Sequence, residues 1–326
     1  MEEWKEYKAN DFCLKVTDGT HDSPKPKANG KHYLITSKHL KSGGIDFSSA
    51  YKISEEDYQK VIERSKVEKF DILFSMIGTI GNIYRESSDN IEYAVKNMAI
   101  FKCGGDSVKS SWLYYWLQSP KAKEYINSRL TGSTQGYLTL DTLRNFPIDF
   151  PSFQTAIKIV SILSSIDDKI EVNRKINSNL EEQAKALFKS WFIDFEPFKD
   201  GKFVDTELGR IPEGWEIKSV GEITANIKEK VGDRKDVKVL SPITSGHLVL
   251  SEDYFSKRVF SESVAKYIVV HYNDFAYNPA RINIGSIGMN EFGYDGCVSP
   301  VYVVFRTEPG YEYFFDLFRQ TTLFKE

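Results

Sequence analysis

Residues 151–197 read PSFQTAIKIVSILSSIDDKIEVNRKINSNLEEQAKALFKSWFIDFEP. Between the two terminal prolines there is no Gly and no Pro, and apolar residues recur at alternating gaps of four and three. That spacing is the a/d pattern of a coiled-coil seam. Pro151-Ser152 is a helix start signal and Pro197 a stop signal. We predict one long helix here, with a seam of Ile159, Leu163, Ile166, Ile170, Asn173, Asn177, Leu180, Ala184, Leu187 and Trp191.

Two asparagines, Asn173 and Asn177, lie at the middle of this seam. A buried Asn lowers stability but fixes the register of a helix pair, because its amide must find a partner. The seam from Ile159 to Trp191 would span about 48 Å, which is longer than the core of a small domain requires. An ordinary amphipathic helix is the simpler alternative. The pattern favours a spacer helix that pairs with another helix through its seam.

Composition places the chain among globular proteins without a strong charge signal. The 326 residues allow one to three domains, with 41% hydrophobic residues, 27% charged residues and a net charge of −3. Cys13, Cys103 and Cys297 lie far apart without metal-ligand spacing, which suits a reducing compartment. The charged N-terminus and the lack of an apolar run of membrane length predict a cytoplasmic protein. A nucleic-acid interface would therefore have to be local.

Residues 1–150 have the pattern of a mixed α/β domain. The segments 71–75 and 94–101 are typical of short strands, and the segment 111–117 is typical of a helix. From Ser23 to Ile45 there is no acidic residue, whereas the stretch contains Lys25, Lys27, Lys31, Lys38 and Lys41. Two prolines and three glycines predict an exposed loop, and its positive charge suits contact with phosphates. A lysine-rich loop that is merely solvated is the alternative.

A second polar stretch, residues 131–137, contains Ser133, Thr134 and Gln135 between glycines. Hydroxyl groups on a flexible backbone can bind phosphates, and Gln can read adenine through two hydrogen bonds in the major groove. These three residues are candidate DNA-binding residues. The alternative is a plain surface loop.

The pattern of the first domain returns after the long helix. Residues 198–212 are polar and contain Gly, which predicts a linker, and residues 213–326 then repeat features of the first domain. Trp4-Lys5-Glu6-Tyr7 is echoed by Trp215-Glu216-Ile217-Lys218, and the segments 71–73 and 78–81 are echoed by 274–276 and 285–288. We predict an α+β protein with two mixed α/β domains, at 1–150 and 213–326, separated by the helix at 151–197.

No catalytic motif emerges from the sequence. Gly78-Thr79-Ile80-Gly81 lacks the frame of a phosphate-binding loop and predicts a tight turn between strands. The five histidines are isolated from one another and from the cysteines, so the sequence indicates no metal site. Tyr277-Asn278-Pro279-Ala280 resembles the start of an amino-methyltransferase motif but lacks the second Pro and the aromatic residue. We predict no catalytic residue, no metal and no cofactor in this chain.

Several motifs, in order along nearly the whole chain, resemble the specificity (S) subunit of type I restriction-modification enzymes. They are Thr17-Asp18-Gly19-Thr20-His21 with Pro24, Asp71 to Ser75 with Gly78 to Asn82, Thr131 to Gln135, Asp167 to Ile170 with Asn173, Leu180-Glu181, Leu187-Phe188, Trp191-Phe192, Leu208-Gly209, Ile211-Pro212 and Trp215. Thr20 and His21 of the first motif join the candidate DNA-binding residues.

The resemblance implies two target-recognition domains that each read one half of a bipartite site in double-stranded DNA. It also implies long helices that pair antiparallel, methyltransferase (M) subunits that dock on them, and restriction and translocase (R) subunits that join this core. S-adenosylmethionine, ATP and Mg are then expected on the partner subunits and not on this chain.

The second repeat ends at Glu326, before counterparts of residues 131–137 and of the long helix. The sequence therefore predicts an incomplete second domain and association of the helix with a second copy or with another S chain. Two alternatives stay open: a truncated or silent variant that acts only through its coiled coil, and a single-chain nuclease-methylase.

Overall fold

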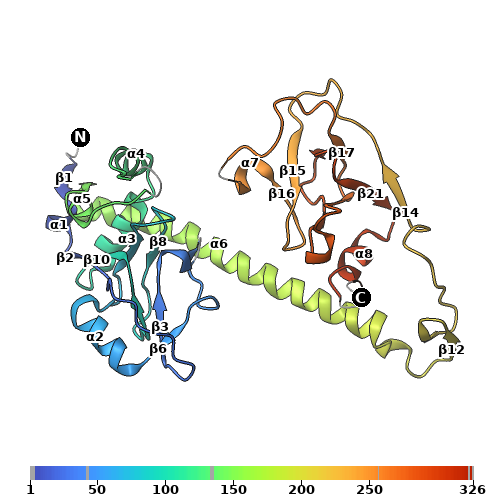
Figure 1. Cartoon of the computed structure of the whole chain (residues 1–326), viewed down its shortest axis with the longest axis horizontal. Helices are drawn as coiled ribbons and strands as arrows, with labels where there is room; N and C mark the ends of the chain where they lie inside the picture. Colours follow the sequence, from blue (N-terminus) through green and yellow to red (C-terminus); the bar gives the residue numbers. More distant parts are fainter. Residues whose placement is uncertain (1–3, 42–43, 133–135, 256, 322–323, 325–326) are drawn as a thin grey trace. The chain divides into compact units, whose positions relative to one another are not determined.

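The computed structural model describes residues 4–41, 44–132, 136–255, 257–321 and 324. Its contacts divide the chain into two compact units, Met1–Lys175 and Ile176–Glu326, which we call unit 1 and unit 2. The helix α6 (Phe153–Phe188) runs from one unit into the other (Figure 1). The domain boundaries expected at 150, 197 and 212 remain predictions.

The centre of unit 1 is an antiparallel sheet in the order β2-β10-β7-β8. Its strands are β2 (Lys15–Asp18), β10 (Met98–Lys102), β7 (Ile72–Ser75) and β8 (Ile83–Arg85). Successive side chains of a strand point to opposite faces, so Ile72 and Phe74 pack into one hydrophobic cluster and Leu73 into another. The sheet is therefore buried on both faces, and both middle strands are almost wholly apolar.

A second sheet in unit 1 has the order β6-β3-β9, with β6 (Lys52–Ile53) antiparallel and β9 (Tyr93–Val95) parallel to β3 (His32–Ile35). The helix α2 (Glu55–Ser65) begins where the Ser54 hydroxyl accepts a hydrogen bond from the Asp57 N–H, and it packs through Tyr58 and Val61. The short elements of this part are α1 (Ala9–Phe12), η1 (Ser37–His39), β4 (Leu40–Lys41) and β5 (Gly44–Ile45).

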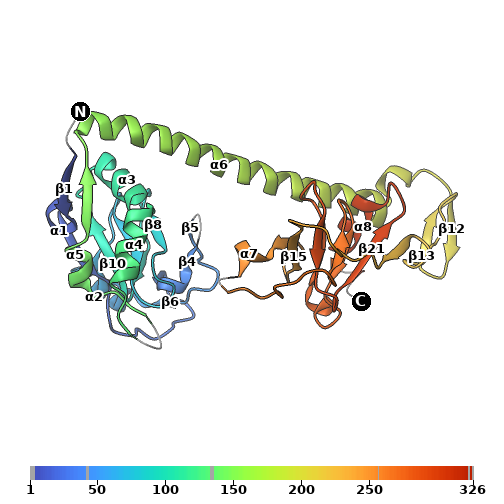
Figure 2. The same ribbon diagram turned by 90° about the horizontal axis from the view of Figure 1, so that it is seen from above.

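Three helices pack into the same hydrophobic cluster as Ile72 and Phe74 of the central sheet. They are α3 (Ser107–Trp116), α4 (Pro120–Ser128) and α5 (Leu140–Arg144). The strand β11 (Pro147–Phe150) pairs antiparallel with β1 (Lys5–Lys8), as Figure 2 shows. Two indole N–H groups of α3 donate to β11: Trp112 to the Asp149 carbonyl and Trp116 to the Pro147 carbonyl, each at 2.9 Å. The strand β11 is thus held between β1 and α3.

The long helix predicted over 151–197 is confirmed as α6, with a different end. A π-helical turn, η2 (Lys189–Ile193), follows it, and Phe195 then adopts a left-handed backbone before the short helix η3 (Glu196–Phe198). In unit 1 the helix packs through Ala156, Ile159 and Val160. Residues 165–183 are all exposed, so the middle of the helix has no cover within the part of the chain described here.

Unit 2 repeats the topology of unit 1. Its first sheet has the order β14-β21-β18-β19, the same order as β2-β10-β7-β8, with all pairs antiparallel. The strands are β14 (Thr224–Ile227), β21 (Val303–Thr307), β18 (Phe275–Tyr277) and β19 (Ile287–Met289). The predicted repetition of the first domain is therefore visible in the strand order.

The second sheet of unit 2 has the order β16-β15-β20-β17. Its strands are β16 (Leu248–Leu250), β15 (Lys238–Pro242), β20 (Gly296–Val298) and β17 (Ile268–Val270). As for β6 and β9 around β3, one neighbour of β15 is antiparallel and the other is parallel. The remaining elements are α7 (Ser251–Tyr254), η4 (Ile282–Ile284) and α8 (Glu312–Phe318).

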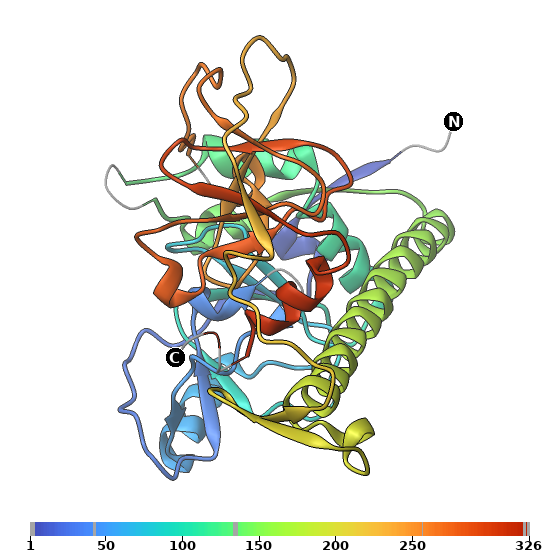
Figure 3. The ribbon, with the colours of Figure 1, turned by 90° about the vertical axis from the view of Figure 1, so that its right-hand side faces the viewer.

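Aromatic side chains join the end of α6 to the rest of unit 2. Phe188 is buried and lies 5.2 Å from Phe314 of α8, centroid to centroid, and Trp215 packs against Phe192 and Phe195. Residues 198–212, expected to form a linker, contain a β-hairpin of β12 (Phe203–Thr206) and β13 (Gly209–Pro212), which extends from the end of α6 (Figure 3). Among the residues that the structure describes, no helix combines the length and the apolar character needed to span a bilayer.

Candidate nucleic-acid interface

Four strands of unit 1 place their connections at one end of the central sheet. Register pairs Met98 with Ser75, Ala99 with Asp18, and Phe74 with Ile83. The last residues of β2 and β7 and the first residues of β10 and β8 therefore lie at the same end of the sheet. The loops that leave this end are residues 19–23, 36–41, 76–82 and 131–138, and we call them the sheet-end loops of unit 1.

The motif at 17–21 is fixed over the turn that precedes β10. A Cβ at Gly19 would lie 2.3 Å from the Val95 carbonyl oxygen, so no larger residue fits this close approach. His21 is exposed, with Nε2 at 2.8 Å from Asp18 Oδ2 and Nδ1 at 3.0 Å from Asn97 Oδ1. The Thr20 hydroxyl accepts the Asp22 N–H at 3.1 Å. The geometry leaves the ring of His21 at the surface, oriented by two polar neighbours.

Hydrogen bonds tie three of the sheet-end loops together. The Asn82 side chain donates from Nδ2 to the Leu40 carbonyl at 2.8 Å, which joins loop 76–82 to loop 36–41. The Leu138 N–H donates to the Met76 carbonyl at 2.9 Å, which joins loop 131–138 to loop 76–82. The turn at 78–81 connects β7 to β8, as predicted. Motifs that lie far apart in the sequence thus form one surface.

The five lysines of the predicted loop divide into two groups. Lys38 and Lys41 lie on loop 36–41 at the sheet end. Lys25, Lys27 and Lys31 precede β3 and lie beside β6, where the Lys27 N–H donates to the Lys52 carbonyl at 2.9 Å. All five side chains are exposed, and none forms an ion pair with a described carboxylate. They are free to meet an anion, but they do not form a single patch at the sheet end.

Part of the predicted exposed loop over 23–45 is instead core, which corrects that expectation. Leu34, Ile35 and Leu40 are fully buried, because the segment supplies β3 and a turn under the sheet. His39 is buried as well; burial lowers its pKa, and its Nδ1 accepts the Thr36 N–H at 2.9 Å. The histidines of this stretch are structural, since the ring of His32 stacks on Tyr58.

Ser133, Thr134 and Gln135 lie outside the residues that the structure describes. On either side of them, Thr131 and Tyr137 are paired, since the N–H group of each donates to the carbonyl of the other, at 3.0 and 2.9 Å. A Cβ at Gly136 would lie 3.5 Å from the Ile80 side chain. Gly136 therefore lies next to the turn at 78–81, and Ser133, Thr134 and Gln135 remain predicted DNA contacts.

Unit 2 has equivalent sheet-end loops, which the sequence pattern did not single out. The connection from β18 to β19 at 278–286 corresponds to loop 76–82, and the Ser286 hydroxyl donates to the Pro242 carbonyl at 2.8 Å, as Asn82 does to Leu40. The repeated glycines at 285–288 were a usable signal. The segment 278–286 contains no lysine, so a pattern of lysine runs does not indicate this surface.

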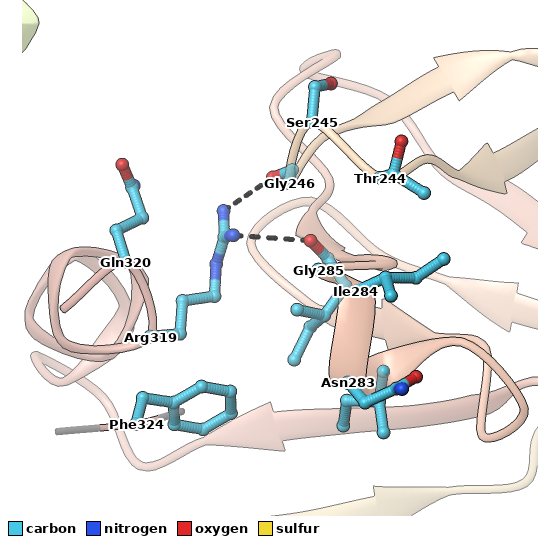
Figure 4. Close-up of a pocket in the computed structure, with 11 residues that line it drawn as sticks. Thr244, Ser245, Gly246, Asn283, Ile284, Gly285, Arg319, Gln320 and Phe324 are labelled. Atoms are coloured by element: carbon cyan, nitrogen blue, oxygen red, sulfur yellow. Dashed lines mark hydrogen bonds between the residues drawn. The ribbon is translucent and has the colours of Figure 1, made fainter. Parts of the chain in front are cut away.

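A pocket of about 510 Å³ lies at these loops (Figure 4). Thr244, Ser245 and Asn283 expose polar groups along it. Arg319 points into it from the end of α8 but is already engaged, since its Nη2 donates to the Gly246 carbonyl at 2.8 Å and its Nε to Asp316 at 2.9 Å. Its Nη1 also donates to the Ile287 carbonyl at 3.3 Å. We assign Arg319 a structural role, because it joins the turn at Gly246 to the start of β19.

The predicted helix interface is only partly covered in this chain. Ile159 packs against the core of unit 1, and Leu163 and Ala184 are half-buried. The rest of the predicted seam is exposed, including Ile166 at 51% and Leu180 at 56% of the residue surface. The exposed members are Ile166, Ile170, Asn173, Asn177, Leu180, Leu187 and Trp191. Ile162 and Ile176, exposed as well, extend this apolar stripe.

Within the described ranges, no cluster of three or more His, Cys, Asp or Glu residues is arranged to hold a metal ion. The three cysteines are free and buried. The features that distinguish the surface are thus loops with hydroxyl, amide and lysine groups at the sheet ends and an uncovered apolar helix.

Comparison with known proteins gives consistent matches. The family model described as the type I restriction modification DNA specificity domain matches residues 1–182. The MjaIX specificity subunit of Methanocaldococcus jannaschii, a type I restriction enzyme subunit, is 45% identical over 120 residues, which cover 36% of this chain and 28% of that protein. The HindI specificity subunit of Haemophilus influenzae is 33% identical over 141 residues, which cover 42% of this chain and 30% of that protein.

These two alignments span less than one third of the length of either relative. The crystal structure of a type I restriction-modification S subunit from M. genitalium matches at a TM-score of 0.52 and 12% identity, over 97% of this chain and 76% of that one. The match shows a shared fold. It confirms the predicted arrangement of two mixed α/β domains and a long helix.

Proposed function

Because the chain belongs to the family of type I restriction modification DNA specificity domains, we propose that it recognises a bipartite DNA sequence for a methylation and restriction complex. Membership of this family also agrees with the prediction that the chain is not an enzyme, since its relatives are specificity subunits. The single observation that carries the proposal is the repeated strand order of the two units. It gives each unit its own set of sheet-end loops.

Each set of loops is suited to read one half of the site. In unit 1, Thr20, His21, Lys38 and Lys41 lie on the sheet-end loops. Hydroxyl and lysine groups hold phosphates and so set the register, whereas an amide such as that of Gln135 can distinguish a base. In unit 2, Thr244 and Ser245 offer hydroxyl groups and Asn283 offers an amide.

Lys25, Lys27 and Lys31 supply the second component of the interface. They lie beside β6, so we assign them to the phosphate backbone that flanks the bases being read. Each neutralised phosphate releases condensed counterions, which raises affinity without sequence preference. Specificity and affinity would then come from different parts of unit 1.

The partners we propose are methyltransferase subunits on α6, and restriction and translocase subunits joined to that core. S-adenosylmethionine, ATP and Mg would then bind to the partner subunits. Support comes from the exposed apolar stripe of α6, since every large apolar side chain left in water forgoes about 1.5–3 kcal/mol of burial.

We further propose that the seam of α6 pairs antiparallel with the same helix of a second copy or of another S chain. The seam from Ile159 to Trp191 is centred on residue 175, so an antiparallel pair brings Asn173 of one helix near Asn177 of the other. Both side chains are exposed in the single chain, which suits amides that find their partners across such a pair.

The proposed function is tested by equilibrium DNA binding of the chain co-purified with its methyltransferase subunit. A duplex that contains the recognised site should compete at least about a thousandfold better than a scrambled duplex at physiological salt. Gln135→Ala should reduce this discrimination at one base pair by about 1–3 kcal/mol if its amide reads a base edge. Equal competition by all duplexes would contradict sequence recognition.

A further inference from the structure

Unit 2 contains an open apolar groove of about 830 Å³. One wall is the segment 214–220, which contributes Ile217 and Val220, and the opposite wall is α8, which contributes Phe314 and Phe318. Phe192 of η2, the turn that follows α6, also lines it. Ile217 is 39% exposed, so an apolar wall of the groove faces solvent.

The equivalent place in unit 1 is filled by a strand. There β11 lies between β1 and α3, paired with β1 in the register Tyr7 to Ile148 and Lys5 to Phe150. Trp112 of α3 contacts Phe150 with ring centroids 5.5 Å apart, and the indole N–H groups of Trp112 and Trp116 donate to two carbonyls of β11.

Two correspondences identify the groove with that place. The segment that contains Trp215 to Lys218 is the sequence echo of Trp4 to Tyr7, which contains most of β1. The helix α8 follows β21 just as α3 follows β10, and β21 and β10 hold the same position in their sheets. The walls of the groove are therefore the counterparts of the two elements that hold β11.

The backbone of the first wall is free to pair. The N–H groups of Glu216, Ile217 and Lys218 have no hydrogen-bond partner in the part of unit 2 that the structure describes, whereas β1 pairs along its length with β11. An unpaired backbone beside an apolar groove is the arrangement that recruits an extended peptide as an added strand.

We propose that this groove is an acceptor site for one extended segment of a separate polypeptide, with the chemistry of β11. Such a segment has apolar side chains at its first, second and fourth positions, as in Pro147-Ile148-Asp149-Phe150. It adds antiparallel to 215–218 and packs its apolar side chains against α8. The strand β11 of this chain is not the donor, because it is already engaged between β1 and α3.

A labelled peptide of residues 144–152, RNFPIDFPS, tests the site by fluorescence polarisation with the full chain. The peptide should bind saturably, and Ile217→Asp should weaken binding at least tenfold. Val259→Asp, which changes another exposed apolar residue of unit 2 outside the groove, is the matched control and should bind the peptide as the parent chain does. No DNA is present, so the result is independent of sequence recognition.

Peptides with one N-methylated amide test the added strand on the unaltered protein. In an antiparallel pair, only every second N–H group of a strand faces its partner. Of two peptides, one methylated at the Ile148 nitrogen and one at the Asp149 nitrogen, one should therefore lose binding and the other should keep it. Absence of saturable binding at millimolar peptide would overturn the acceptor site. So would equal binding to the Ile217→Asp chain, or equal binding of the two methylated peptides.

Discussion

Lys102 Nζ lies 2.7 Å from Asp71 Oδ2, and this ion pair joins β10 to the residue that precedes β7. Unit 2 has the same pair at the equivalent place, where Arg306 Nε lies 2.6 Å from Asp274 Oδ1. Both aspartates are buried. The repeated pair shows that the two units share an internal arrangement as well as a strand order.

The pair in unit 1 predicts a measurable contribution to stability. Burial raises the pKa of Asp71, while the hydrogen bond from Lys102 opposes this and favours the charged carboxylate. Asp71→Asn removes a charge-assisted hydrogen bond, although Lys102 keeps its ion pair with Glu68 at 2.7 Å. The variant should therefore lower the free energy of unfolding by about 1.5–3 kcal/mol. Urea unfolding measures this decrease. Asp89→Asn, which breaks the exposed pair with Lys69, should cost less than about 1 kcal/mol.

The lysines beside β6 predict a change in salt dependence. Replacing Lys25, Lys27 and Lys31 together by Ala should weaken DNA binding on all sequences alike. The slope of log affinity against log salt should fall by roughly 0.9 for each phosphate that the variant no longer neutralises. Lys38→Ala with Lys41→Ala should reduce the slope in the same way and also alter sequence preference, because these two lysines lie at the sheet end.

The matched control for the lysine variants is Lys123→Ala with Lys158→Ala, two exposed lysines on α4 and α6. This variant should keep the parent slope. A triple variant at 25, 27 and 31 with an unchanged slope would place the phosphate contacts elsewhere on the chain.

The exposed stripe of α6 predicts association. Light scattering after gel filtration should give a mass above that of one chain at tens of micromolar. Ile166→Asp with Ile170→Asp should return the chain to one copy, because charges on the seam are not tolerated in a helix pair. Lys169→Asp, an exposed charge change on the same helix, is the control. A parent chain that stays a folded monomer at these concentrations would end the pairing proposal.

The raised pKa of His271 predicts that the stability of unit 2 depends on pH. Burial by itself lowers the pKa of His271, but Glu229 at 2.9 Å and Asp295 at 3.0 Å raise it above its usual value. A raised pKa means that the folded chain binds the proton more tightly than the unfolded chain. The stabilisation is therefore complete below about pH 6.5 and disappears as the pH rises through the folded pKa.

His271→Gln should consequently destabilise unit 2 more at pH 6 than at pH 8.5. Thermal unfolding of the parent and the variant at both values measures the difference. The same decrease in stability at both values would show that the two carboxylates do not act through the charge on His271.

The sequence predicted elements well where the apolar pattern was continuous. The segment 71–75 contains β7, and 111–117 lies largely in α3. The run 94–101 is divided between β9 and β10, because Asn97 adopts a left-handed backbone and turns the chain. Asn adopts the left-handed conformation more readily than most residues, so Asn97 was a signal for a turn. The apolar residues on both sides favoured one continuous strand instead.

The candidate site was predicted less completely, for physical reasons. Counting lysines over 23–45 ignored the apolar residues that make part of the segment core. On the helix, Phe188 follows the seam residue Leu187 by one position, which turns its side chain by about 100° toward unit 2. A seam defined by spacing alone cannot show which face a neighbouring domain covers.

Above all, we propose that this chain directs methylation to a bipartite DNA site. Sequencing of methylated bases in the genome, with and without an intact gene for this chain, is the most direct test. We expect deletion of the gene to remove one bipartite N6-methyladenine motif and to leave every other methylated motif in place. A plasmid copy of the gene should restore that motif. A full set of methylated motifs in the deletion strain would contradict the proposal.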